Sequence, residues 1–176
     1  MSGHNKWSQI KERKGKTDAA RSRLFSKLGR LITQEAKKAG GNRDSTGLKA
    51  AIERARAANM PNDNIERAIK KAAGDRGAAL ELVLYEAYGP GGVAVLIETL
   101  TDNRNKTSQE IRHILSERGL SLAAPGSAAW AFRRSADGYA AQTLIPLENG
   151  NLARLEELVE ALEGNADVQA VFTNAE

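Results

Sequence analysis

Cysteine is absent from the 176-residue sequence. Its absence excludes disulfide frameworks, thiolate nucleophiles, cysteine-type zinc sites and iron–sulfur clusters. Only two histidines are present, His4 and His113, and no partner set for a metal site accompanies either of them. No apolar run approaches the length of a membrane span. We therefore expect a soluble protein of a reducing compartment, the cytoplasm, with no metal, no cofactor and no membrane partner.

Acidic residues are nearly missing from the first sixteen positions, where Glu12 stands among five Lys or Arg. A secretory signal would need an apolar stretch after its positive charges, and none follows here. Gly3, Gly15 and the lack of a Leu/Phe stripe argue against an amphipathic presequence. We expect this basic tail to belong to the working protein, as an arm that is disordered until it meets its target.

The charges are divided unequally along the chain. Through Arg76 there are nineteen Lys/Arg and eight Asp/Glu, a balance of +11, whereas from Gly77 onward seven cations face fourteen acids, a balance of −7. Such asymmetry is typical of a nucleic-acid-binding module joined to an acidic one. We therefore predict two domains, a basic one over residues 1–76 and an acidic one over residues 80–176.

The basic half has the pattern of helices. Apolar residues recur at helical spacing in three segments, 17–39, 46–58 and 63–74. The apolar stripe of the first segment begins at Leu24. In the third segment we expect Asp63 to cap the helix and Glu66 to close a capping box. Brief connections between three amphipathic helices predict a small three-helix bundle that carries the basic tail.

The acidic half changes to a strand-like pattern. Two runs, 80–88 and 93–100, flank Gly-Pro-Gly-Gly at 89–92, which predicts a hairpin. Further elements are expected as helices over 104–118 and from an Asn151 cap to Gly164, and as strands over 127–132, 138–145 and 167–173. Five strands and two helices indicate an α+β fold, an antiparallel sheet covered on one face by two helices.

A basic stripe follows the first predicted helix, with Gln34 and Lys37 extending it. Solvated helix faces usually mix charges so that i,i+4 pairs form, but between Ala19 and Ala39 the only acidic residue is Glu35. A phosphate backbone would relieve the repulsion between the like charges. The sequence therefore predicts a nucleic-acid interface made by cations of the tail and of this helix: Lys6, Lys11, Arg13, Lys14, Lys16, Arg21, Arg23, Lys27 and Arg30.

Two features allow more than one interpretation. Trp7 either staples the tail onto the bundle or stacks on an unpaired RNA base, and the flanking charges of Lys6 and Lys11 favour stacking. The segment TDNRNKT at 101–107 is either a strand-to-helix turn with a capping Asp or Asn, or a polar recognition loop. No nucleophile–base–orienter set is found in the sequence, so we do not expect an enzyme.

Five stretches resemble the YebC/PmpR family, which includes the mitochondrial translational activators of cytochrome oxidase subunit one. They are SGHNKW at 2–7, NMPNDNIERAIKKA at 59–72, YEAYGPGGVAV at 85–95, LTDNRNKT at 100–107 and DVQAVFTNAE at 167–176. The resemblance implies a three-helix domain followed by α+β lobes. It also implies a role first described as transcriptional regulation and then as ribosome-associated translation, in which stalling at consecutive prolines is relieved.

The same resemblance suggests partners and contact residues. The expected partner is ribosomal RNA of the large subunit, or a tRNA, with DNA as the alternative, and we expect a monomer. The family's tail motif matches Gly3, His4, Lys6, Trp7, Ile10, Lys11, Arg13 and Lys14, and its exposed loop matches Asn103, Arg104 and Asn105.

The chain departs from the family pattern in three places. Asn5 stands where Ser is usual, and Glu12 where His is common. After Arg134, where familiar members insert a third lobe, the chain passes through Ser-Ala-Asp-Gly into the next predicted strand. We expect a short hairpin to close this gap.

Overall fold

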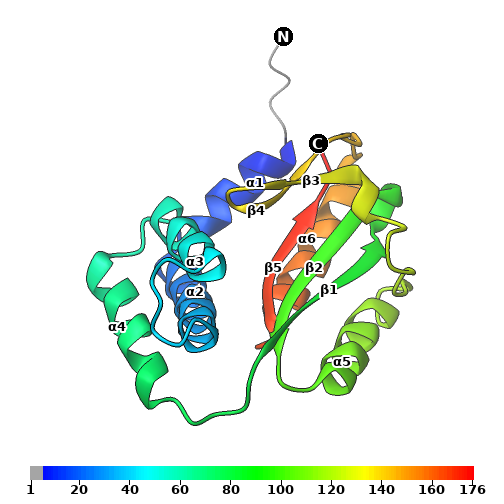
Figure 1. Cartoon of the computed structure of the whole chain (residues 1–176). Helices are drawn as coiled ribbons and strands as arrows, with labels where there is room; N and C mark the ends of the chain where they lie inside the picture. Colours follow the sequence, from blue (N-terminus) through cyan, green and yellow to red (C-terminus); the bar gives the residue numbers. More distant parts are fainter. Residues whose placement is uncertain (1–5) are drawn as a thin grey trace. The chain divides into compact units, whose positions relative to one another are not determined.

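The computed structural model describes residues 6–176, so Gly3, His4 and Asn5 lie outside the described part of the chain. Two compact units are formed (Figure 1). The α+β unit contains residues 6–11, 81–134 and 139–176, and the helical unit contains residues 12–80 and 135–138. Residues 6–11 of the basic tail therefore belong to the same unit as the acidic half.

The helical unit is a three-helix bundle, as the sequence predicts. It comprises α2 (Asp18–Lys38), α3 (Thr46–Ala57) and α4 (Asn62–Gly74), with α3 and α4 both packed against α2. Its core joins buried side chains from all three helices: Leu28, Leu31, Ile32, Ala36, Leu48, Ala51, Ala55, Met60, Ile65 and Ala68. Asn59 has a positive φ of 59°, and the Met60 N–H after it bonds to the Ala55 carbonyl, which ends α3.

Three details of the bundle differ from the prediction. Pro61 precedes α4 without a side-chain cap, and the Glu66 carboxylate is held by Arg43, at 3.0 and 2.6 Å, so no capping box forms. Leu24 is 42% exposed because the buried positions of α2 begin only at Leu28. Gln34, expected on the polar stripe, is only 4% exposed.

The α+β unit is built on a three-stranded antiparallel sheet in the order β1-β2-β5. Its strands are β1 (Glu81–Tyr88), β2 (Ala94–Thr101) and β5 (Val168–Thr173). The turn η1 (Pro90–Gly92) joins β1 to β2 in register from Glu81 opposite Thr101 to Tyr88 opposite Ala94. The central strand β2 is buried at all eight positions, including the polar residues Glu98, Thr99 and Thr101.

Both faces of this sheet are covered, whereas the sequence predicted cover on one face only. One face packs against α5 (Arg104–Ser116) and α6 (Asn149–Glu163). Against the other face lie η2 (Ala129–Ala131) and a separate two-stranded sheet of β3 (Phe132–Ser135) and β4 (Gly138–Ala141). The five strands thus form two sheets, because β3 and β4 pair with each other and pack on the first sheet through side chains. The α+β class itself is confirmed.

Several element boundaries also differ. The predicted strand over 127–132 is mostly turn and η2, and α6 begins after Glu148 instead of at an Asn151 cap. The hairpin expected after Arg134 is present, with only Ala136 and Asp137 between β3 and β4. Among residues 6–176, no helix is both long and apolar enough to cross a membrane.

Candidate nucleic-acid interface

The described part of the basic tail is helical. Helix α1 (Lys6–Gly15) lies within the segment that was predicted to be a disordered arm. Gly15 ends the helix, and the short turn that follows leads into α2. The disordered-arm prediction is therefore wrong for residues 6–15.

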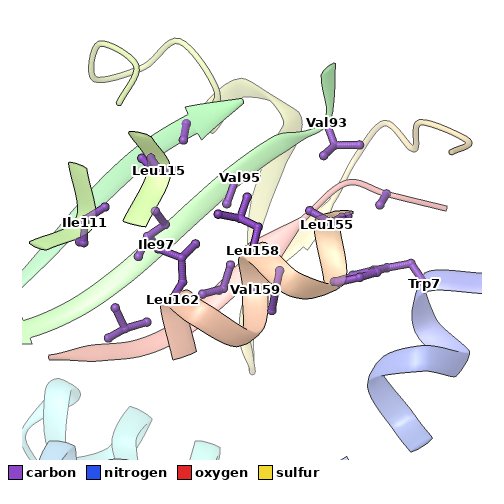
Figure 2. Close-up of a cluster of buried hydrophobic side chains, with 14 of the residues drawn as sticks. Trp7, Val93, Val95, Ile97, Ile111, Leu115, Leu155, Leu158, Val159 and Leu162 are labelled. Carbon is purple, nitrogen blue, oxygen red and sulfur yellow. The ribbon is translucent and has the colours of Figure 1, made fainter. Parts of the chain in front are cut away.

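Trp7 is buried, with 5% of its surface exposed. Figure 2 shows its ring extending from α1 toward α6, at the edge of a core that includes Leu155, Leu158 and Val159. A base cannot stack on a ring enclosed in this way, so the stacking hypothesis is corrected. The alternative hypothesis, that Trp7 anchors the tail by packing, agrees better with the structure. Trp7 packs into the core of the α+β unit, however, and not against the three-helix bundle.

Two of the predicted phosphate contacts help to hold α1 in place. The Lys6 ammonium donates to the Asn149 side-chain oxygen at 3.1 Å, and that of Lys11 donates to the Val171 carbonyl at 3.4 Å. Lys11 is exposed along its side chain, but protein atoms surround its ammonium. The resulting desolvation lowers its pKa from the usual lysine value, against an opposing effect of Glu163. These two cations therefore have structural partners within the α+β unit.

Exposed cations gather in sequence around the turn between α1 and α2, within the helical unit. The set, here called the junction cluster, consists of Arg13, Lys14, Lys16, Arg21 and Arg23, all of them exposed. Only Glu12 and Asp18 add negative charge between residues 12 and 23, which leaves this segment net positive.

The turn itself is fixed by hydrogen bonds. The Thr17 hydroxyl accepts from the Ala20 N–H at 3.1 Å and lies 3.3 Å from the Lys14 carbonyl, to which it donates. Thr17 is thus the N-cap of α2, a position that favours Ser and Thr for this reason. The cap holds the start of α2 in a fixed geometry directly beside the junction cluster.

The basic stripe becomes less accessible toward the end of α2. Lys27 and Arg30 are half-buried and, like Lys14 of the junction cluster, have interactions with other groups of the protein; Gln34 is buried. Lys37 is half-buried and donates to the Gly77 carbonyl at 2.6 Å. The surface open to a large anion is therefore the junction cluster more than the whole stripe.

The loop at 101–107 acts as a strand-to-helix turn. Asn103 caps α5 by accepting from the Lys106 N–H at 3.1 Å, and Arg104 forms a bidentate pair with Glu81 at 2.6 and 2.5 Å. The Thr107 hydroxyl donates to the buried Asp167 carboxylate at 2.8 Å, and this bond anchors the end of the loop to the strand side of the α+β unit. Asn105 is exposed. Capping thus accounts for Asn103, and the Arg104 guanidinium already has a carboxylate partner.

A buried carboxylate that was not predicted as functional, Glu86, holds the segment before η2 against the sheet face that η2, β3 and β4 cover. Glu86 on β1 accepts the backbone N–H groups of Gly126, Ala128 and Ala129 at 2.6, 2.7 and 2.8 Å. Its burial raises the pKa of the carboxyl, but the three donors together outweigh this effect and hold the pKa below the usual glutamate value. The only sequence indication was an acidic residue within a strand whose other residues are mainly apolar.

No group of three or more His, Cys, Asp or Glu side chains is placed to hold a metal ion within residues 6–176. The cations of the junction cluster can bind phosphate groups through charge and hydrogen bonds. This surface can therefore bind polyanions.

Comparison with known families matches two parts of the chain. Residues 5–75 match the TACO1/YebC protein N-terminal domain, and residues 80–137 match the TACO1/YebC second and third domain. A crystal structure of the conserved hypothetical protein Aq1575 from Aquifex aeolicus is similar to this fold, with a TM-score of 0.72 and 31% sequence identity. The similarity covers 90% of this chain and 91% of that one.

Three relatives each bear the name probable transcriptional regulatory protein. The chain is 46% identical to one from Petrotoga mobilis, in an alignment that covers 100% of this chain and 71% of the relative. It is 49% identical to one from Fervidobacterium nodosum, in an alignment that covers 93% of this chain and 66% of the relative. It is 38% identical to one from Pelotomaculum thermopropionicum, over a 240-residue alignment that covers 100% of this chain and 99% of the relative. The chain therefore spans only about two thirds of the first two relatives. Because both matched domains and the fold agree with the resemblance in the sequence, the chain belongs to the TACO1/YebC family.

Proposed function

We propose that this protein is a regulatory nucleic-acid-binding protein that acts as a ribosome-associated translation factor. The observation that carries the proposal is the junction cluster, five exposed cations within eleven residues that span the end of α1, the capped turn and the start of α2. Cations at this density attract a polyanion, and a phosphate backbone supplies closely spaced anions.

The proposed mechanism is positioning without catalysis. The helical unit binds phosphates through the junction cluster and orders an RNA segment, either ribosomal RNA of the large subunit or a tRNA end near the reaction centre. By holding that RNA in a productive geometry, the protein relieves stalled peptide synthesis, for example at consecutive prolines. The family resemblance motivates this choice of process and of RNA, and the net positive charge of the helical unit supports a nucleic-acid partner.

A second candidate is a DNA-binding transcriptional regulator. It is favoured by the name that the three relatives bear, probable transcriptional regulatory protein. The same cations would then contact duplex phosphates, because phosphate contacts carry no information on sequence or on the kind of nucleic acid. The two candidates differ in the partner with which the protein travels in a cell.

Partition in a lysate separates these candidates. The natural protein is expected to sediment with ribosomes after DNase treatment and to be released by RNase. Replacing Arg13, Lys16, Arg21 and Arg23 with Gln should shift it to the soluble fraction. An equal number of exposed cations elsewhere, Lys38, Lys49, Arg112 and Arg154, provides the control. Release by DNase and not by RNase would support the transcriptional alternative, and no association with either would contradict both.

A further inference from the structure

The two tryptophans of the chain have opposite surroundings. Trp7 is buried, whereas Trp130 in η2 is 59% exposed and is the most exposed large hydrophobic side chain among residues 6–176. Exposing an indole ring to water has a cost, since tryptophan is highly buried on average. An exposed aromatic ring with a polar edge is a frequent contact point for partners.

Trp130 has hydrogen-bond partners at both its ring and its backbone. Its indole N–H donates to the Tyr88 hydroxyl at 3.4 Å, and that hydroxyl donates to the Ser127 carbonyl. The Glu86 carboxylate fixes the N–H groups of the two preceding residues, and the Gln142 side-chain amide donates to the Trp130 carbonyl at 3.3 Å. A ring held in this way loses little conformational freedom when a partner binds to it.

Positive charge follows Trp130 directly along the chain. Arg133 and Arg134 on β3 are both exposed, and the Arg134 guanidinium lies 4.6 Å from the centre of the Tyr139 ring. Three residues of extended chain span at most about 10 Å, so Arg133 is within reach of a phosphate attached to a base at Trp130. Between Glu117 and Glu148 the only acidic residue is Asp137, against three arginines. This segment is therefore positive within an otherwise acidic half of the chain.

We propose that Trp130 stacks on an unpaired nucleobase while Arg133 binds the adjoining phosphate, which gives the α+β unit its own contact with single-stranded nucleic acid. An aromatic face beside cations is the usual arrangement for binding single strands, because every base has a π-face and every linkage a charge. A duplex would not serve, since its bases are stacked on one another. The inference rests on the proposed function and adds a second contact to the junction cluster.

Tryptophan fluorescence tests the stacking directly. In a Trp7→Phe variant of the full chain, Trp130 is the only tryptophan, and a mixed-sequence single-stranded RNA 12-mer should quench its emission. The same sequence as a duplex should leave the emission nearly unchanged, although the duplex still binds to the junction cluster.

Affinity measured in the natural Trp7 background gives an independent test, because Trp7→Phe could disturb the core. Trp130→Leu should weaken single-strand binding by about 5-fold to 100-fold, the range expected for one stacked base, and Trp130→Phe by less. The melting temperature should change little, since most of the ring is exposed. Leu144→Ser, at another exposed apolar residue of the same unit, should not affect binding.

Arg133→Gln should reduce the slope of log affinity against log salt by about 0.7, whereas Arg154→Gln should not.

The results distinguish failure of this inference from failure of the proposed function. Unchanged Trp130 emission and unchanged affinity of Trp130→Leu, with binding still dependent on the junction cluster, would overturn the stacking contact alone. Quenching by a protein partner but not by RNA would do the same. If the natural chain bound neither the single strand nor the duplex, the proposed function and the stacking contact would both be overturned.

Discussion

Trp7 is the residue through which α1 joins the core of the α+β unit. Replacing it with Ala should lower the free energy of unfolding of that unit by about 3–5 kcal/mol, because a large buried aromatic side chain leaves a cavity. Trp7→Phe should recover part of the loss. Urea unfolding followed by circular dichroism measures both changes.

The control for this substitution is Trp130→Ala, which removes the same side chain from an exposed position. Its cost in stability should be small. Equal losses for Trp7→Ala and Trp130→Ala would contradict the burial of Trp7.

Glu86 predicts a specific acid sensitivity. Its pKa is lowered in the folded protein, so its contribution to stability is present above the unfolded-state pKa, about 4.3. That contribution is lost as the pH falls through the lower folded-state pKa. The natural protein should therefore be more stable than Glu86→Gln at pH 7, and the difference should shrink below about pH 4.3. Thermal unfolding of both proteins from pH 7 to 3 measures this, and a difference that does not vary with pH would refute it.

At the scale of elements, the turn between β1 and β2 depends on two glycines in different ways. Gly91 and Gly92 both have positive φ, 71° and 79°. A Cβ on Gly91 would collide with the Leu147 side chain, whereas one on Gly92 would meet open space. Gly92→Ala should cost about 1–2 kcal/mol for the left-handed backbone. Gly91→Ala should cost about 1–3 kcal/mol more because of the collision. Chemical denaturation compares the two variants, and equal costs would show that Leu147 does not pack on this turn.

Helices and strands whose apolar residues recur at regular spacing were predictable from the sequence. The stripes of α2, α3, α4 and α6 and the strands of the 80–101 hairpin follow from apolar spacing, because their packing involves a regular face. The helical state of α1 was not predictable in this way, since its burial depends on the Trp7 ring entering a core formed by residues eighty or more positions away. The capping box failed for a related reason: Arg43, distant in sequence, holds the Glu66 carboxylate.

The candidate site was predictable only in part. Charge spacing identified all the cations of the junction cluster, but it could not separate these exposed residues from Lys11 and Lys37, whose ammonium groups bond to backbone carbonyls. The exposure of Trp130 was also hidden, because a strand-like pattern over 127–132 does not show which side chains face the sheet. Accessibility depends on tertiary packing, which local patterns do not contain.

At the scale of the whole molecule, the two units should differ in their independence. The core of the helical unit is complete within residues 12–80. A fragment of these residues should fold cooperatively as helices. A fragment of residues 80–176 lacks Trp7 and should melt at a lower temperature than the same unit in the full chain.

A peptide of residues 1–16 added to the 80–176 fragment should raise that melting temperature with increasing concentration, by mass action. Circular dichroism and calorimetry follow both effects. A fragment as stable as the unit in the full chain would show that α1 contributes nothing to its core.

The proposed function requires that the junction cluster binds phosphates. Its most direct test is the salt dependence of single-stranded RNA binding by the full chain and by the variant with Arg13, Lys16, Arg21 and Arg23 replaced by Gln. Each phosphate contact contributes about 0.7 to the slope of log affinity against log salt, so the variant should lose about 3 from that slope. The variant with Lys38, Lys49, Arg112 and Arg154 replaced by Gln should keep the natural slope. A junction variant whose slope equals that of the natural protein would contradict the account.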